Sequence, residues 1–463
     1  MAKKGKASKK RQRAKKPPTV ILIPEGALPE NDHEALALNR LLQKTCHDDD
    51  SRSGHWIDIP YQEWEYLLGT DYARVIDRLS GRDDGFKPVN RSKVDKPCST
   101  QRKGYVDVNE HYSNGATRRA AKLEGPGFCR SYRLVERFRA PRAQKHELKR
   151  RRCKVLTQST LTDPSDGVLV DQFKRVVITI PDGATSWETL AAEIAMTSRH
   201  IYALRNYGDR FYSTFTCLPK AVRQAMMTID DERLVEIDVS NCQQLITAHL
   251  LEQWLACEQS EIGGGREGAS CSSLSISPGN SCHLYRSLCE AGELYQFLHE
   301  QCDGMKLRDF YVECHRPDAP VRREDIKKAV MVVLFGNRSE MTGCKMWEVW
   351  QKHFPEVCEY LLDVKTCRRD GKTIDINRDF AKRLRCLEAS AMVDGAAKSL
   401  ILNHPDITVI TVHDSILVPE RFVDIAKQEV TSQFQRLFGL TPHLKDSIKR
   451  RAAIDPPELP HLP

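Results

Sequence analysis

Two aspartates, far apart in the chain, each lie at the end of an apolar run that is rich in β-branched residues. Asp238 ends the run in segment 235–250, VEIDVSNCQQLITAHL, and Asp414 follows the run in segment 407–419, ITVITVHDSILVP. Such runs have the length and composition of buried strands. Two strand-borne carboxylates can hold one pair of metal ions, which can activate a 3′-hydroxyl and stabilise a leaving pyrophosphate. The two aspartates together therefore predict metal-dependent transfer chemistry.

Each aspartate also has a simpler interpretation. From Leu245 onward the apolar residues recur at helical spacing, so the first segment predicts a strand, a tight turn and a helix. Asp238 and Ser240 would then cap the helix, because Asp and Ser favour that position. Asp414 would stabilise a hairpin turn through local backbone hydrogen bonds, which is a frequent use of Asp.

A third segment, 321–337, carries cations and apolar groups on one predicted helical face. The residues spaced four apart on this face are Arg323, Lys327, Met331 and Phe335. Gly336 follows them and is typical of a helix end. A triphosphate requires fixed cations, and a base or sugar requires an apolar surface, so the face suits a nucleotide. An ordinary amphipathic helix has the same spacing, but the position of the segment between the two aspartates favours the nucleotide interpretation.

In combination, these segments resemble motifs A, B and C of the family A nucleic acid polymerases. That family includes the bacterial repair DNA polymerases and the single-subunit phage and mitochondrial RNA polymerases. The residues that match motif A are Asp238, Ser240, Ala248, His249 and Leu250. Those that match motif B are Arg323, Lys327, Phe335 and Gly336, and those that match motif C are His413 and Asp414. Arg210 and Pro219 fall near an Arg and a Pro of the segment before motif A, and the resemblance covers roughly residues 205–445.

The resemblance implies a metal site and a phosphate site. Asp238 and Asp414, with the backbone carbonyl of Val239, would hold two Mg²⁺ ions, for which Mn²⁺ could substitute. Mg²⁺ suits such a site because it prefers oxygen ligands and shares substrate phosphates with few carboxylates. Arg323 and Lys327 would bind the triphosphate and neutralise the charge that develops on it.

The resemblance also implies contacts to the nucleotide and the primer. Met331 and Phe335 would pack on the incoming nucleotide, and Gln243 would face its sugar. Arg210 and His413 would lie near the primer terminus. The implied activity is template-directed nucleotidyl transfer. The main expectation is a DNA polymerase that acts on a DNA primer-template and uses dNTPs, with NTPs as a second possible substrate.

Three departures from the family pattern concern the choice of sugar. DNA polymerases of the family usually carry Glu where this chain has Gln243, Tyr where it has Phe335, and Glu where it has Ser415. Gln is neutral and both donates and accepts, and Phe has no hydroxyl to hold it. We therefore expect weak discrimination between dNTPs and NTPs. An RNA polymerase or primase of the same fold, and a nucleic-acid-binding replication protein without catalysis, remain open alternatives.

Composition favours an anionic partner and gives no sign of a membrane segment. The chain has 463 residues, a net charge of +8 and a pI near 8.7, which mildly favours nucleic acid. Its 16 cysteines include no close C-x-x-C pair, so we expect them to be reduced. No apolar stretch is long enough to span a membrane and no signal sequence is visible. The expected location is the cytoplasm, with association with the nucleoid in a bacterium.

The predicted fold class is α+β, a right-hand polymerase palm and fingers with a small N-terminal α+β accessory domain. The expected segments are a disordered basic tail at 1–17, an accessory domain at 18–138, a basic linker with a thumb-like connecting region at 139–204, palm and fingers at 205–450 with the fingers at about 290–350, and a C-terminal tail at 451–463.

The region before the polymerase-like part also contains recognisable patterns. Residues 55–79 predict a short strand and two helices, and residues 129–138 predict a strand, which suits a winged-helix-like module or a small α+β domain. The basic runs 1–16 and 139–154 suit contact with nucleic acid. The alternatives are a solubilising tail for the first run and a solvated helix face or linker for the second.

Two further expectations concern the polymerase-like part. Residues 258–282 are rich in Gly and Ser and predict a mobile surface loop. Residues 378–403 predict a long helical stretch that leads into the second aspartate segment. Glu388 lies in this stretch, where it could face the site, but a surface position or a buried polar network is favoured.

Overall fold

The structure is a computed structural model, and its backbone elements form two compact units. The residues that it describes are 19–47, 57–59, 61–69, 72–80, 106–112, 130–148, 163–180, 183–198, 203–205, 209–262, 280–310, 318–369 and 372–447. The first unit comprises Met1–Val155, Asp182–Ile201 and Cys217–Pro219, and the second comprises Leu156–Pro181, Tyr202–Thr216 and Lys220–Pro463. The mixed helical and strand content is that of an α+β protein.

The first unit contains two small sheets and four α-helices in its described part. Its strands are β1 (Thr19–Pro24), β2 (Ile57–Ile59), β3 (Val106–Tyr112), β4 (Arg130–Leu134) and β5 (Ala143–Leu148), and its helices are α1 (Asp32–His47), α3 (Tyr61–Leu68), α4 (Tyr72–Leu79) and α7 (Ser186–Ser198). β1 pairs with β5, and the other sheet has the order β2–β4–β3. The buried pair of Arg40 and Glu63 joins α1 to α3.

The second unit is organised around a four-stranded sheet with the order β13–β14–β10–β15. These strands are β10 (Leu234–Val239), β13 (Ile410–Val412), β14 (Ser415–Pro419) and β15 (Leu444–Asp446). β10 pairs antiparallel with β14 on one side and with β15 on the other. All five residues of β14 are buried, which explains why that segment reads as a continuous apolar run.

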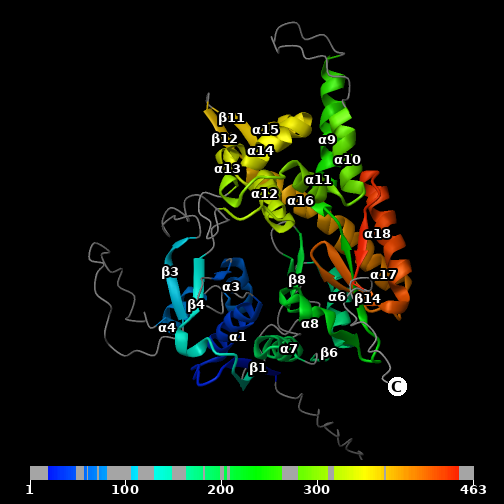
Figure 1. The fold of residues 1–463 in the computed structure, drawn as a ribbon. Helices are drawn as coiled ribbons and strands as arrows, with labels where there is room; N and C mark the ends of the chain where they lie inside the picture. The colour runs from blue at the N-terminus through cyan, green and yellow to red at the C-terminus, as the bar shows by residue number, and fades with distance from the viewer. Residues whose placement is uncertain are drawn as a thin grey trace, which may run out of the picture. The chain divides into compact units, whose positions relative to one another are not determined.

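Helices pack against the sheet and continue from it (Figure 1). α18 (Val423–Phe438) and a π-helical segment (Ser390–Ala397) contact its strands. α9 (Cys242–Ile262) follows β10 in the chain, and α16 (Asn377–Ala389) and α17 (Lys398–Asn403) flank the π-helical segment. α18 buries Val430, Phe434 and Phe438. It ends at Gly439, which has the left-handed conformation (φ 66°) that favours glycine at this position.

A second group of helices follows α9 in the chain. These are α10 (Asn280–Glu290), α11 (Leu294–Gln301), α12 (Arg323–Phe335), α13 (Arg338–Gly343), α14 (Lys345–His353) and α15 (Pro355–Lys365), followed by the hairpin of β11 (Thr366–Arg369) and β12 (Lys372–Asp375). The rings of Tyr285, Trp350 and Phe354 pack edge to face in their core, with centroids 5.3–6.0 Å apart. α12 packs between α11, α13, α14 and α16 (Figure 1), so its position is fixed from several sides.

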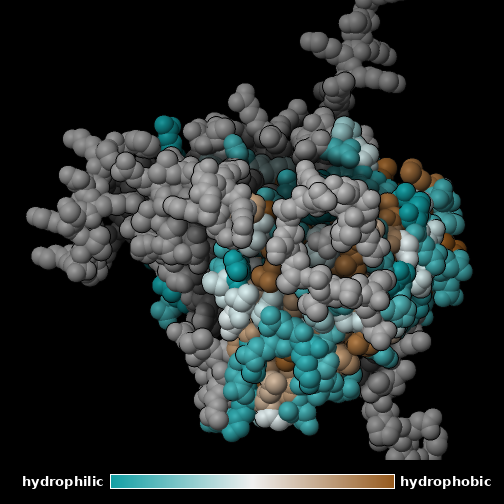
Figure 2. Space-filling view, turned by 90° about the horizontal axis from the view of Figure 1, so that it is seen from above, coloured by the Kyte–Doolittle hydropathy of each residue, from teal (hydrophilic) through white to brown (hydrophobic). Residues whose placement is uncertain are grey.

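Short elements complete the second unit. They are α6 (Gly167–Gln172), α8 (Lys220–Gln224), and the strand pairs β6 (Val176–Ile178) with β9 (Met226–Thr228) and β7 (Ala203–Arg205) with β8 (Phe211–Ser213). Hydrophilic residues make up most of the coloured surface in Figure 2. No described helix is both long and apolar enough to cross a membrane.

The structure confirms most of the local predictions and corrects two. The strand at 57–59, the helices at 61–68 and 72–79, and the strand–helix and hairpin patterns around the two aspartates are present. The loop expected at 258–282 is wrong at both ends, because α9 extends to Ile262 and α10 begins at Asn280. The residues between those helices lie outside the described part of the chain, as do the predicted tails at 1–17 and 451–463.

The second correction concerns the linker expected at 139–204. Residues 143–148 form strand β5, which pairs along its whole length with β1. Residues 186–198 form α7, which belongs to the first unit. A charged run can form an edge strand when its alternate side chains face solvent, so the cationic composition concealed the strand.

Candidate active site

A cavity of about 330 Å³ opens at the end of the four-stranded sheet, beside α12. The residues that line it are Arg210, Asp238, Val239, Ser240, Asn241, Cys242, Gln243, Gln244, Tyr295, Arg323, Lys327, Met331, His413, Asp414 and Lys445. The structure thus brings nine of the ten predicted site residues together. Phe335, one turn further along α12, is not among the lining residues, and the Arg385 guanidinium lies 5.9 Å from its ring centroid.

The two aspartates meet because β10, which contains Asp238, is paired with β14, the strand that Asp414 directly precedes. Asp238 is the fifth residue of β10 and lies opposite Ser415, the first residue of β14. The backbone N–H of Val239 donates to the carbonyl oxygen of Asp414 at 3.2 Å. Asp238 lies inside a strand, and α9 begins four residues later, after Asn241. The capping interpretation of Asp238 is therefore wrong.

Asp414 lies in a strongly acidic environment. Burial, together with the negative charges of Glu388 and Asp238, raises the pKa of Asp414 to about 7. Burial and nearby negative charges both disfavour the ionised carboxylate, so the proton is held more tightly. The group would lose this proton readily in the presence of a cation.

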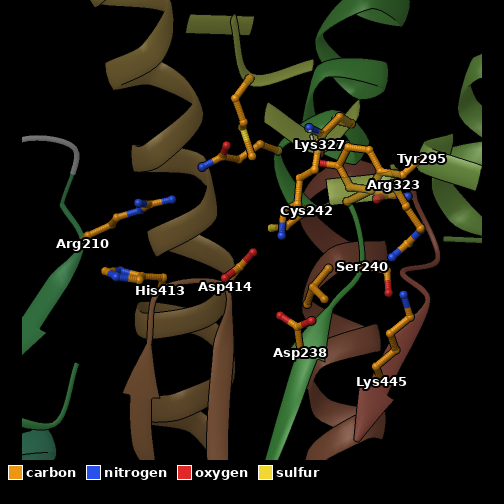
Figure 3. Close-up of a pocket in the computed structure, with 15 residues that line it drawn as sticks. Arg210, Asp238, Ser240, Cys242, Tyr295, Arg323, Lys327, His413, Asp414 and Lys445 are labelled. Atoms are coloured by element: carbon orange, nitrogen blue, oxygen red, sulfur yellow. Dashed lines mark hydrogen bonds between the residues drawn. The ribbon is translucent and has the colours of Figure 1, made fainter. Parts of the chain in front are cut away.

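The cations lie on the other walls of the cavity. Figure 3 shows Asp238 and Asp414 in the centre, Arg323 and Lys445 on one side, and Arg210 and His413 on the other. Arg323 and Lys327 are exposed on α12 and form no ion pair within the described part of the chain. The Arg323 guanidinium lies 5.9 Å from the ring centroid of Tyr295. The cavity therefore offers cationic groups to an anionic ligand.

A buried polar network forms the wall behind Asp414. Oε2 of Glu388, a fully buried residue, accepts hydrogen bonds from the Arg210 guanidinium at 2.6 Å and from Nε2 of Gln243 at 3.1 Å. Glu388 thus belongs to a core network, as favoured from the sequence, and that network borders the cavity. Phe335 has no hydroxyl to hold Gln243, but Glu388 accepts a hydrogen bond from its amide.

The turn that carries Asp414 is strained. His413 and Asp414 are the two loop residues between the paired Val412 and Ser415. His413 has φ 55°, a conformation that glycine adopts more easily than other residues. Its ring packs edge to face on Tyr212, with centroids 5.3 Å apart. Strained residues of this kind cluster at functional sites.

Sequence reasoning missed several lining residues. Lys445 comes from β15, which is only three residues long and has no hydrophobic pattern that could reveal it. Tyr295 accepts a hydrogen bond from Nε2 of Gln244 at 2.9 Å and lies beneath Arg323. Tyr295 lies in the fingers segment expected at about 290–350, but no spacing rule relates it to the aspartates. Cys242 is buried, and burial raises the pKa of its thiol well above the usual range.

A second acidic cluster lies in the same unit. The carboxylates of Asp163, Asp166 and Asp394 approach within 4.8 Å of one another. Arg205 and Lys398 both form ion pairs with Asp166 and with Asp394. Two cations therefore already neutralise the cluster, which we regard as a structural ionic network.

Comparison with known proteins assigns the chain to no family. No protein-family model and no curated protein sequence matches it. Among solved structures, a match is the POL domain of Pol1 from M. smegmatis in complex with DNA primer-template and dNTP. The two are 16% identical, the match covers 54% of this chain and 46% of that chain, and the TM-score is 0.31.

Proposed function

We propose that this chain is a template-directed nucleotidyltransferase with a polymerase palm and fingers, acting first of all as a DNA polymerase. The four-stranded sheet would be the palm and the helices α10–α15 would belong to the fingers. The observation that supports this proposal most directly is that Asp238 of β10 and Asp414 line one cavity with Arg323 and Lys327 of α12. Asp414 lies in the turn directly before β14, the strand that pairs with β10. Carboxylates opposite fixed cations suit a metal-bound polyphosphate.

The donor set fits Mg²⁺. Asp238 and Asp414 offer oxygen ligands, and burial together with the negative charges of Glu388 and Asp238 raises the pKa of Asp414. These two residues and the carbonyl of Val239 would hold the metal. When bound, Mg²⁺ would activate the primer 3′-hydroxyl and stabilise the leaving pyrophosphate.

The protein side chains have separate roles in this proposal. Arg323 and Lys327 bind and orient the triphosphate and neutralise the charge that develops on it. Met331 contacts the nucleotide, and Gln243 faces its sugar. Arg210, held by Glu388, and His413 lie on the opposite side of the aspartates in Figure 3, where the primer terminus would be.

Primer extension tests the proposal. The full chain is given a DNA primer-template, Mg²⁺ or Mn²⁺, and either dNTPs or NTPs. We expect incorporation by the wild type and a loss of at least about 100-fold in Asp238→Asn and Asp414→Asn, since changes in outer-sphere residues alone cost 10–100-fold. Asp406→Asn, an exposed aspartate just before β13, is the matched control.

The same assay separates the alternatives. Incorporation of NTPs alone indicates an RNA polymerase or primase. Tight DNA binding with no incorporation of either set of nucleotides contradicts catalysis and indicates a replication protein that only binds DNA. Equal activity of both aspartate variants and the wild type contradicts the metal site.

We also propose that the first unit contains a winged-helix-like module. The sheet order β2–β4–β3, with α3 and α4 between β2 and β3 in the chain, supports this. α4 would then face DNA and present the exposed Arg74. Arg74→Gln should reduce the slope of log affinity against log salt for duplex DNA by about 0.9, the value for one phosphate contact. Lys174→Gln, an exposed lysine outside the module and outside both basic runs, should leave the slope unchanged.

A further inference from the structure

Lys445 is a cavity residue that the motif pattern does not include. It lies on β15, the short fourth strand of the sheet, and is directly paired with Asp238 of β10. Directly opposite residues of antiparallel strands project from the same face, with their Cβ atoms about 4.5–5.5 Å apart. Lys445 and Asp238 therefore share the face that borders the cavity, and both line it.

The alternation along β15 supports this orientation. Asp446, the next residue, is buried and forms an ion pair with Lys427 of α18, on the helix-covered side of the sheet. Successive side chains of a strand point to opposite faces. Lys445 must therefore point away from α18 and toward the cavity.

Several contacts hold β15 in place. The N–H of Ser240 donates to the carbonyl oxygen of His443 at 2.9 Å, and Oγ of Ser240 lies 3.2 Å from Nδ1 of His443. The N–H of Ser447 donates to the carbonyl oxygen of Glu236 at 3.0 Å, and the N–H of Glu236 donates to Oγ of Ser447 at 3.1 Å. Both ends of the strand are thus fixed to β10 or to the residue that follows it. A cation on such an element is positioned before any ligand arrives.

The charge distribution of the cavity indicates what this cation contacts. Arg323 and Lys445 lie on the same side of the two aspartates in Figure 3. Arg323 and Lys327 of α12 and Lys445 of β15 all line the cavity. Three cationic side chains from two rigid elements match an extended polyanion better than a single phosphate.

We propose that Lys445 contacts the polyphosphate of the incoming nucleotide, as a third cation beside Arg323 and Lys327. This inference rests on the proposed function and adds to it a residue from the C-terminal strand. Lysine suits the role because its ammonium group acts as a compact point charge with three donors.

Binding of inorganic tripolyphosphate to the full chain tests the proposal without requiring catalysis. Affinity is measured by calorimetry in excess Mg²⁺ for the wild type and for Lys445→Gln, Lys445→Arg and Arg323→Gln, with Lys352→Gln as control. Lys352 is exposed at the end of α14 and does not line the cavity. We expect Lys445→Gln to weaken binding at least about tenfold, equivalent to ~1.4 kcal/mol, and Lys445→Arg and Lys352→Gln to stay within about threefold.

The outcomes separate this inference from the proposed function. If Arg323→Gln weakens tripolyphosphate binding and Lys445→Gln does not, Lys445 has no phosphate role and the proposed function stands. If Lys445→Gln instead tightens Mg²⁺ binding and leaves tripolyphosphate affinity unchanged, Lys445 competes with the metal at Asp238 and the inference is wrong. If the wild type does not bind tripolyphosphate at all, the inference and the phosphate site of the proposed function both fail. Thermal unfolding of each variant shows that the fold is retained.

Discussion

Nε2 of Gln243 lies 3.1 Å from the carboxylate of Glu388, which is 145 residues further along the chain. The same carboxylate oxygen accepts from Arg210, and Oε1 of Glu388 has no hydrogen-bond partner within the described residues. The hydrogen bond fixes which end of the Gln243 amide faces α16. The Gln243 side chain is therefore less mobile than a glutamine without such a hydrogen bond.

If Gln243 faces the sugar, Glu388 should control sugar discrimination. We expect the ratio of kcat/KM for dATP and ATP to fall at least about tenfold toward unity in Glu388→Ala, because the freed amide can move away from a 2′-hydroxyl. The double variant Gln243→Ala/Glu388→Ala should show no further change, since both substitutions remove one interaction. The measurement is steady-state incorporation on one primer-template.

A matched control for this variant is Glu359→Ala, an exposed glutamate of α15. Loss of the Arg210 ion pair should lower kcat for both nucleotides equally, and the ratio removes this effect. A wild-type ratio that Glu388→Ala leaves unchanged would show that the Gln243–Glu388 pair has no part in sugar choice.

The left-handed backbone conformation of His413 should lower the stability of the folded chain. A residue other than glycine in the left-handed conformation costs roughly 1–2 kcal/mol, so we expect His413→Gly to be more stable than His413→Ala by about 1 kcal/mol. The usual order at a regular position is the reverse. Urea unfolding of the two variants measures the difference, and equal or reversed stabilities would contradict strain at this turn. Both variants should incorporate nucleotides more slowly than the wild type.

Stability should fall with rising pH because of Asp414. Its pKa is about 7 in the folded chain and near 3.9 in an unfolded chain, so the folded state binds more protons between these values. The contribution of the group is fully present below pH 4 and is lost as pH rises through 7. In a chelator, Asp414→Asn should therefore gain stability relative to the wild type between pH 5 and 8, by a few kcal/mol at most. Parallel stability curves of wild type and variant across this range would contradict the raised pKa.

Lys365 should give the opposite dependence. It is fully buried, and its ammonium donates to the carbonyl oxygens of Val333 at 2.6 Å and Gly336 at 3.2 Å, at the end of α12. Burial lowers the pKa of Lys365 to about 7, so between pH 7 and 10.5 the unfolded state binds more protons and stability rises with pH. The difference in unfolding free energy between wild type and Lys365→Met should grow over this range. Denaturant unfolding at pH 7 and 9.5 measures it, and a constant difference would mean that Lys365 titrates normally.

The sequence by itself determined the local elements and the candidate residues around the two aspartates. Alternating and helical patterns located β10, α9, α12 and the β13–β14 hairpin, because each of these elements buries one face or one run of its own residues. The spacing of four residues placed Arg323, Lys327 and Met331 on one face for the same reason. These patterns depend only on residues that are close together in the chain, so a single sequence is enough to detect them.

Only the tertiary structure decided which residues surround the aspartates from elsewhere in the chain. Helix packing brings Glu388 to the site, and strand pairing brings Lys445 there. Neither kind of contact can be predicted from the spacing of residues within a segment. Lys445 depends on the register of a three-residue strand against β10, and Glu388 on the packing of α16 against α9. The linker expected at 139–204 is wrong at residues 143–148 for the same reason. These residues form strand β5 because β1 supplies its hydrogen bonds, and their own sequence gives no apolar alternation.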